Sequence, residues 1–312
     1  MHIALSAPST AIPRFWKGFW KLAAPKISLA SLCAVFLGTA AAAQAGTLST
    51  GWLLVTVFGI LCLEFAKNAT NEIFDFDSGV DQAVKPEDRS PFSGGKRVLV
   101  DGWLTRAEAI RISIVGYALC AVCGVAIVLL REPKVLLIGL AGCALAWFYS
   151  APPVRLSYRG WGEIAVALAY GPLICAGSYL VQTGHAPLRI WLLSIPMGLL
   201  TAGFLWANQF PDYDADRSAG KRNMVVRLGR VEASHALGAI VGIAFVVLGI
   251  LPFAGLPQTV LFGLAALPVA AGAVQKIREH AECTAELIPG QEMMLFTMVI
   301  FAVTAGLGLV VG

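Results

Sequence analysis

The chain has 312 residues, of which 57% are hydrophobic and only 13% are charged, and its mean hydropathy is +0.74. Soluble domains carry about twice that share of charged residues, so the composition excludes an ordinary soluble protein and indicates a polytopic membrane protein. We therefore expect the lipid bilayer as its surroundings and no nucleic-acid partner.

Runs without charged residues predict nine membrane-spanning helices, because one span needs about 20 apolar residues. Residues 27–63 and 236–275 are each long enough for two spans. One span each is predicted for residues 112–130, 135–154, 164–184, 190–211 and 293–312. The expected fold class is an all-α membrane bundle, formed by a single integral-membrane domain over residues 1–312.

The basic residues predict how this bundle is oriented. Twenty of the 23 Lys and Arg residues lie on one side of the predicted spans, and an excess of such residues marks the cytoplasmic side. The amino terminus is then on the cytoplasmic side and the carboxyl terminus on the outer side, and we expect the membrane to be a bacterial cell membrane. Residues 1–26 form a cytoplasmic amphipathic tail, and residues 78–106 and 213–232 form cytoplasmic cap loops.

The first span also resembles a secretory signal, because AAAQA precedes Gly46 as a cleavage site would. The apolar run before it is long for such a signal, however. We therefore expect the first span to remain and to pair with the second.

The segment NQFPDYDAD stands where a long apolar run meets a basic segment. Its residues Asn208, Asp212 and Asp216 are spaced four apart, which on one helix places all three side chains on one face. Asn208 fits a helix-packing hydrogen bond nearly as well as a place beside a metal ion.

A similar stretch, NATNEIFDFDSGVD, lies upstream on the same predicted side. Asn71 and Asp75 are again four apart, and Gly79 is expected to end the helix so that Asp81 is presented from a loop. Carboxylate and amide oxygens bind hard cations such as Mg²⁺, which also accept phosphate oxygens as ligands. Two such half-sites predict one metal cluster held between two helices.

Basic residues follow both acidic stretches. Lys221 and Arg222 lie close enough to reach what the aspartates bind, and Lys96 and Arg97 follow the glycines of SGGKR, whose backbone amides suit a phosphate. A diphosphate site backed by an apolar interior fits a lipid diphosphate. Metal and cations stabilise diphosphate as a leaving group, and the allylic chain would then leave as a carbocation.

The loop WFYSAPPVRLSYRGWGE follows the fourth predicted span. We expect Tyr149 and Arg155 to lie near the site, whereas Tyr158 and Trp161 fit an aromatic belt at the membrane surface. Aromatic faces stabilise cations, so a tyrosine near the site suits a reaction through a carbocation.

Two local pairs are also predicted. Glu64 and Lys67 are three apart within the second span and are expected to form an ion pair. Thr105 and Glu108 have the spacing of a capping box at the start of the third span.

The motifs NATNEIFDFDSGVD, YSAPPVRL and NQFPDYDADRSAGKRNMVVRLG resemble those of the UbiA superfamily of intramembrane prenyltransferases. The resemblance covers nearly the whole chain and includes the count of nine helices. The chain looks most like the branch that prenylates 1,4-dihydroxy-2-naphthoate in menaquinone synthesis, although YSAPPVRL is as similar to the chlorophyll synthase branch. The resemblance implies Mg²⁺-dependent transfer of a polyprenyl group from an allylic prenyl diphosphate to an aromatic acceptor.

Carried over residue by residue, the resemblance places Asn71, Asp75 and Asp81 in the first metal half-site and Asp212 and Asp216 in the second. The expected catalytic residues are Asp75, Tyr149, Arg155, Asp212 and Asp216, and the expected substrate-binding residues are Asn71, Lys96, Arg97, Lys221 and Arg222.

Two residues depart from the family pattern. Glu72 stands where the family usually has Asp, so its carboxylate reaches further. Ala24 stands where the family often has Arg before Pro25, which leaves Lys21 or Lys26 as a possible substitute for that cation.

Several alternatives stay open at this point. A terpene cyclase of the same superfamily would use the same ionisation with an internal alkene as acceptor. Chlorophyllide, homogentisate or 4-hydroxybenzoate could replace the naphthoate, and an ion-coupled transporter is a more distant alternative. A weak symmetry between the two acidic stretches also predicts two four-helix repeats followed by a ninth helix.

Overall fold

The computed structural model describes residues 13–93 and 96–312, and these residues form helices, turns and loops without any β-strand. The all-α expectation is therefore confirmed for the described residues. Residues 1–12 of the predicted tail and the two glycines of SGGKR, Gly94 and Gly95, lie outside them.

Within this described part of the chain, eight helical stretches are long and apolar enough to cross a membrane. They are α2 (Pro25–Gln44), α3 (Thr50–Asp77), α5 (Arg106–Leu130), α7 (Gly162–Leu168) continued by η3 (Ala169–Ala176) and α8 (Gly177–Thr183), α9 (Leu188–Asn208), α12 (Arg230–Ile250) continued by η4 (Leu251–Ala254), η5 (Gln258–Ala266) continued by α13 (Leu267–Glu279), and α14 (Thr284–Val311). Each coincides with a predicted span.

The remaining predicted span, residues 135–154, corresponds to α6 (Val135–Phe148), which is apolar but has only 14 residues. The helix stops before Pro152 and Pro153, because proline lacks a backbone N–H and disfavours helical geometry in the residue before it. Eight of the nine predicted spans are thus confirmed as long apolar helices. The ninth span and the arrangement as two four-helix repeats stay predictions.

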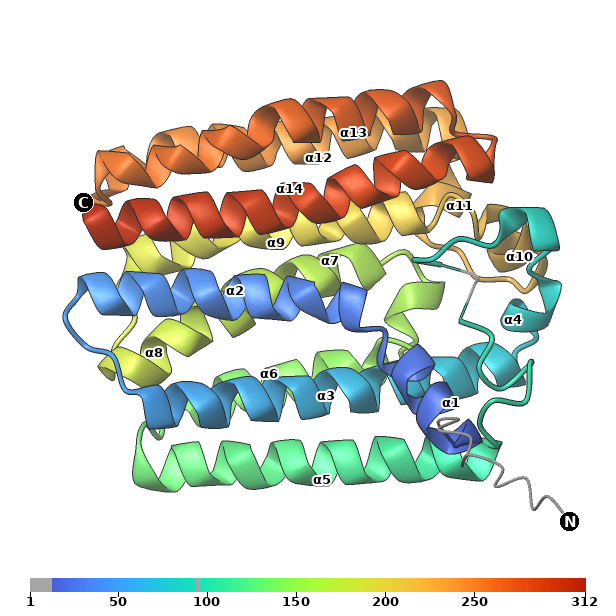
Figure 1. Ribbon diagram of the computed structural model, residues 1–312, viewed down its shortest axis with the longest axis horizontal. Coiled ribbons are helices and arrows are strands. Elements are labelled where there is room, and N and C mark those ends of the chain that lie inside the picture. Colours follow the sequence, from blue (N-terminus) through green and yellow to red (C-terminus); the bar gives the residue numbers. More distant parts are fainter. Residues whose placement is uncertain (1–12, 94–95) are drawn as a thin grey trace, which may run out of the picture.

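The helices run side by side along the long axis of the molecule (Figure 1). Helices α2, α9, α12, α13 and α14 surround one large apolar core, and α3 packs against α5 at the opposite edge of the bundle. Glycine permits the closest approaches, since a Cβ on Gly38 of α2 would lie 2.0 Å from the carbonyl oxygen of Cys175 in η3. Small residues serve membrane helices in this way because backbones can then touch.

Helix α1 (Arg14–Ala23) lies at one end of the bundle together with the predicted cap segments, and Gly312 lies at the other end (Figure 1). The predicted cap segment 78–106 contains α4 (Val80–Ala83) and η1 (Pro86–Asp88), and the segment 213–232 contains α10 (Tyr213–Ser218) and α11 (Met224–Leu228). Helix α4 contacts α10, so the two predicted caps meet at this end.

Helix α5 begins as predicted. Thr105 accepts a hydrogen bond from the backbone N–H of Glu108, and the Glu108 carboxylate accepts one from the backbone N–H of Thr105. This capping box fixes where the segment 78–106 ends and the α5 helix starts.

Candidate active site

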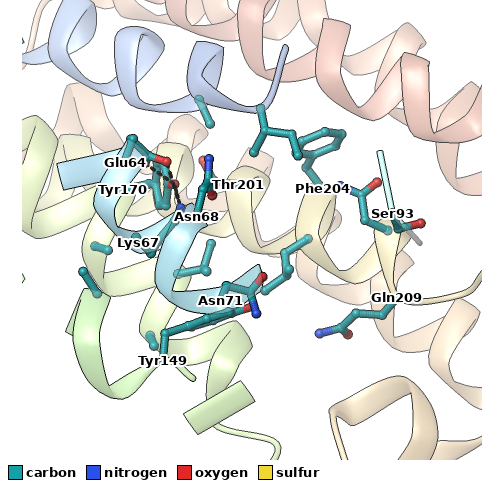
Figure 2. A pocket seen from close by; sticks show the side chains of 18 of the residues that line it. Glu64, Lys67, Asn68, Asn71, Ser93, Tyr149, Tyr170, Thr201, Phe204 and Gln209 are labelled. Atoms are coloured by element: carbon teal, nitrogen blue, oxygen red, sulfur yellow. Dashed lines mark hydrogen bonds and ion pairs between the residues drawn. The ribbon is translucent and has the colours of Figure 1, made fainter. Parts of the chain in front are cut away.

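A cavity enters the bundle from the end where α4 and α10 meet, and it runs inward between α3, α6, η3 and α9. Its walls are mainly apolar, and its polar residues form two groups, one at the mouth and one further inside. Figure 2 shows part of its lining. The group at the mouth consists of Asn71, Glu72, Asp75, Asp81, Lys96, Asn208, Gln209, Asp212, Asp216 and Lys221.

The last two turns of α3 form the first half of the mouth. Asn71 and Asp75 lie one turn apart on the same face, and the Asn71 amide donates to Asp75 Oδ2 at 2.8 Å and to Ser150 Oγ at 3.0 Å. Tyr158 Oη donates to Asp75 Oδ1 at 2.7 Å. Both oxygens of Asp75 are therefore held in place by neighbouring side chains.

Asp81 completes this half-site from α4 rather than from a loop. Gly79 adopts a left-handed backbone (φ 83°) after α3 ends, and this turn starts the short helix that carries Asp81. Burial, together with the charges of Asp75 and Glu72, raises the pKa of the Asp81 carboxyl to about 8. Asp81 Oδ2 is buried and has no hydrogen-bond partner in the described chain.

The second half-site differs from its prediction. Asn208, Asp212 and Asp216 do not share one helix, because α9 ends at Asn208 and α10 begins only at Tyr213. Asp212 and Asp216 keep helical spacing, since the backbone N–H of Asp216 donates to the carbonyl of Asp212 at 2.8 Å. Asn208 accepts a hydrogen bond from the side chain of Gln291 at 3.1 Å, which ties it to α14.

Lys221 joins the two half-sites. Its Nζ lies 3.4 Å from Asp75 Oδ2 and 3.3 Å from Asp216 Oδ1. Burial opposes the Lys221 charge, but the charges of Asp216 and Asp75 outweigh it and hold the pKa well above its usual value. Asp216 is 1% exposed, and its other oxygen accepts from Asn223 at 2.6 Å.

Comparison with known proteins identifies the family of this chain. The model of the UbiA prenyltransferase family matches residues 31–288, which is most of the chain. The chain belongs to the UbiA prenyltransferase family. It is thus an integral, multi-pass membrane protein and a prenyltransferase. This family favours the enzyme over the alternative of an ion-coupled transporter.

Individual relatives agree with this. The chain is 26% identical over 227 residues to the 1,4-dihydroxy-2-naphthoate octaprenyltransferase of Bacillus subtilis, covering 73% of this chain and 71% of that one. A UbiA homologue from Aeropyrum pernix has the same fold, with a TM-score of 0.68 and 21% identity over 90% of this chain and 97% of that one. A UbiA homologue from Archaeoglobus fulgidus, bound to GPP and Mg²⁺, aligns with a TM-score of 0.62 and 18% identity over 95% of this chain and all of that one.

The mouth of this UbiA-family protein has the chemistry of a site for a hard cation. Besides Asp81 Oδ2, Asp212 Oδ1 is buried and has no hydrogen-bond partner among the described residues. Burial raises the pKa of Asp212 well above its usual value and that of Asp216 to about 6. These buried carboxylates have too few positively charged neighbours to neutralise them. A cation that binds oxygen ligands would stabilise their charged form.

The carboxylates nevertheless do not form a closed metal cage. In residues 13–93 and 96–312, no three His, Cys, Asp or Glu side chains converge as a set of metal ligands. The side chains at the mouth fit Mg²⁺ because this ion commonly takes only one or two carboxylates and completes its coordination with water and phosphate oxygens.

The basic residues predicted at the site, for catalysis or for substrate binding, divide into two groups. Lys221 and Lys96 line the cavity, whereas Arg97, Arg155 and Arg222 do not. Arg97 donates to the backbone carbonyl of Asp81 at 2.7 Å and thereby holds α4 in place.

The other two arginines of this group lie around Tyr158. The guanidinium of Arg155 stacks on the Tyr158 ring at 3.8 Å. Arg222 contributes its backbone N–H to the Tyr158 carbonyl at 2.9 Å and exposes its side chain. Of the aromatic residues, Tyr149 lines the cavity as predicted, and Trp161 is exposed as expected for a belt residue.

The belt interpretation of Tyr158 is wrong. Tyr158 is 8% exposed and makes hydrogen bonds with both Asp75 and Ser78, each at 2.7 Å. No local pattern distinguishes it from a belt residue, because the contact joins residues 83 positions apart. The one indication in the sequence is that Tyr158 lies three residues after Arg155, which is itself predicted to lie near the site.

Sequence reasoning also missed the supports of the site. Glu72 lines the mouth but also has a structural role. Its carboxylate accepts hydrogen bonds from the backbone N–H groups of Val98 and Leu99 and so holds the 78–106 segment in place. Neither Lys21 nor Lys26, the possible substitutes for the cation that the family often has at Ala24, lines the cavity: Lys21 pairs with Asp101 at 3.4 Å, and Lys26 is exposed.

The second polar group lies further inside the cavity, where the wall is otherwise apolar. Glu64 and Lys67 form the predicted ion pair, with Lys67 Nζ 2.8 Å from Glu64 Oε2. Tyr170 from η3 and Ser31 from α2 both donate to Glu64 Oε1. Figure 2 shows Glu64, Lys67 and Tyr170 together at one side of the pocket.

Proposed function

We propose that this prenyltransferase moves a polyprenyl group from an allylic prenyl diphosphate to an aromatic acceptor of the naphthoate type. The observation that carries this proposal is the cavity itself. Its mouth combines two carboxylate half-sites with Lys221 between them, and its interior is lined mainly by apolar side chains. Such a cavity suits a substrate with a diphosphate head and a hydrocarbon chain.

The residues that would hold Mg²⁺ are Asn71, Asp75, Asp81, Asp212 and Asp216. Bound Mg²⁺ supplies Lewis-acid stabilisation of the negative charge on a departing diphosphate. The Archaeoglobus fulgidus homologue, which was solved with GPP and Mg²⁺, supports this assignment.

The chain's own residues would do the rest of the work. Lys221, and Lys96 from the cap segment, would neutralise diphosphate charge at the mouth. The apolar wall would exclude water from the allylic carbocation. The aromatic faces of Tyr149 and Tyr170, both in the lining, would stabilise that cation until the acceptor ring captures it.

The naphthoate assignment rests on the Bacillus subtilis relative and on the SPFSGGKRVLVDG and DRSAGKRNMVVRLG segments. The assignment would change if the prenyl group were transferred to 4-hydroxybenzoate, homogentisate or chlorophyllide instead, or if it cyclised without an acceptor. A panel of these acceptors with radiolabelled prenyl diphosphate in membranes separates them. Product formed from prenyl diphosphate alone would identify a cyclase.

The positive-inside pattern supports an orientation in which the mouth faces the cytoplasm of a bacterium and Gly312 faces outward. In that orientation the water-soluble diphosphate head and the acceptor would reach the mouth from the cytoplasm, and the prenyl chain would reach the interior from the bilayer.

The proposed mechanism is tested by Asp75→Asn and Asp212→Asn, one in each half-site. Each should lower Mg²⁺-dependent diphosphate release by about a hundredfold or more, since changes even behind a metal site lower activity by about 10–100-fold. Asp77→Asn is the matched control, because Asp77 pairs with Arg106 at the surface at 2.7 Å and should leave turnover unchanged. Normal turnover in Asp75→Asn or Asp212→Asn would refute a mechanism that needs both half-sites.

A further inference from the structure

The inner polar group of the cavity is a complete ion-pair cluster within the membrane-spanning part of the bundle. Glu64 is 5% exposed and accepts from Ser31 at 2.6 Å, from Tyr170 and from Lys67. Lys67 also donates to the Tyr170 hydroxyl at 2.9 Å. Glu64 therefore meets three donors, so its charge and its hydrogen-bonding capacity are well satisfied.

Lys67 is satisfied less completely. An ammonium group has three N–H donors, and the two partners above account for two of them. The Lys67 side chain keeps 21% of its surface exposed, and it lines the cavity. One donor and a positive charge are thus available to a molecule inside the cavity.

This charge lies deeper in the cavity than the carboxylates that would hold the diphosphate. Lys67 precedes Asp75 by eight residues on α3, which places it about 12 Å further along the helix axis. Its ammonium group turns further inward still, toward Glu64 on the preceding turn, and away from Asp75. Lys96 and Lys221 already provide cations at the mouth.

A role in stability alone does not account for the cluster. Replacing a buried ion pair by apolar residues is often neutral or stabilising, and ionisable residues inside a membrane usually mark a functional site. A prenyl chain offers nothing for an ammonium group to bind. The ligand with a matching group is the second substrate of the reaction, an aromatic acid with ring hydroxyls.

We propose that Lys67 binds an anionic oxygen of the aromatic acceptor, either its carboxylate or an ionised ring hydroxyl. Glu64, Tyr170 and Ser31 are positioning residues that hold the Lys67 ammonium toward the cavity. Because Glu64 balances the Lys67 charge, the cluster adds little repulsion toward a carbocation. This inference rests on the proposed function for the identity of its ligand.

The test uses the full-length protein, purified in detergent, with 1,4-dihydroxy-2-naphthoate and with 1,4-dihydroxynaphthalene, which lacks the carboxylate. Calorimetry measures acceptor binding without prenyl diphosphate, and kinetics measure KM for each substrate. In Glu64→Gln/Lys67→Met, which leaves no unpaired charge, the acceptor Kd and KM should rise about ten- to hundredfold, as expected for loss of a charge-assisted hydrogen bond. The KM for prenyl diphosphate should stay unchanged.

Two further variants separate recognition from folding. Lys134→Met is the matched control, because Lys134 is 69% exposed and lies 3.8 Å from Glu132 in another ion pair, and it should change neither KM. Lys67→Arg keeps the charge and should retain much of the acceptor affinity. Loss of affinity for the naphthoate alone identifies the carboxylate as the ligand, and equal loss for both compounds identifies a ring hydroxyl.

The outcomes distinguish this inference from the proposed function. Wild-type protein that binds the aromatic acid through Lys67 without prenylating it would overturn the proposed function and uphold the inference. Unchanged acceptor affinity in Glu64→Gln/Lys67→Met, an equal loss of prenyl diphosphate affinity, or a wild-type protein that binds neither compound would overturn the inference.

Discussion

The pair Asn71–Asp75 on α3 and the pair Asp212–Asp216 before and within α10 have the same spacing, but their surroundings differ. Asp75 lies on a continuous helix of 28 residues, and Asn71, Tyr158 and Lys221 surround its two oxygens. Asp212 follows the end of α9, and its Oδ1 is buried with no hydrogen-bond partner in the described residues.

The difference indicates that the two half-sites are organised differently before a ligand binds. The α3 pair is built in advance, because its hydrogen bonds exist without a substrate. The α10 pair keeps a carboxylate in an unfavourable environment, as functional sites often do at the expense of stability. A cation bound together with the substrate would compensate the negative charge of Asp212. We therefore expect Asp212 to contribute strongly to the binding of that cation.

The largest expected effect is opposite in sign for the two pairs. Without metal, Asp75→Asn should lower the free energy of unfolding by about 1.5–3 kcal/mol, since charged hydrogen-bond partners are lost. Asp212→Asn should raise it by about 0.5–2 kcal/mol, since a poorly solvated carboxylate is removed. Thermal unfolding in detergent with a chelator measures both effects. Destabilisation by Asp212→Asn would contradict the proposed difference between the two pairs.

The pH dependence of the metal-free protein should sharpen the comparison. The pKa of Asp216 is raised to about 6 and that of Asp81 to about 8, in both cases mainly by burial. Between the ordinary carboxyl pKa of about 4 and these values, the folded state holds protons that the unfolded chain has released. The free energy of unfolding should therefore fall as pH rises from about 4 to 8.

Added Mg²⁺ should reverse this loss, and more strongly at pH 8 than at pH 5, because only ionised carboxylates bind it well. Melting temperatures with and without Mg²⁺ across this range measure the effect. A melting temperature that rises with pH in the chelated protein would contradict the assignment of poorly solvated carboxylates to the mouth.

The smallest expected effect concerns the support of the α3 pair. Tyr158→Phe removes one hydrogen bond from Asp75 but leaves those from Asn71 and Lys221, so kcat/KM should fall about tenfold. Tyr117→Phe is the control, since Tyr117 packs against Trp147 and does not line the cavity. Equal activity in both variants would show that Asp75 is positioned without Tyr158.

Much of the fold could be predicted because its signals are local. Charge-free runs gave the positions of all eight long spans, and the capping box at Thr105 and the Glu64–Lys67 pair depend only on helical spacing. The length of α6 was overestimated because the charge-free run continues to residue 154, although the helix ends at Phe148.

The sequence by itself determined that this protein lies in a membrane, that it carries two acidic stretches with flanking cations, and which family it resembles. These properties follow from composition and from periodicity within one helix. Only the tertiary structure decided that Tyr158 holds Asp75, that Lys221 bridges Asp75 and Asp216, and that Asn208 is tied to α14. Those contacts join distant segments, and their formation depends on how the helices and cap segments pack, which no local periodicity encodes.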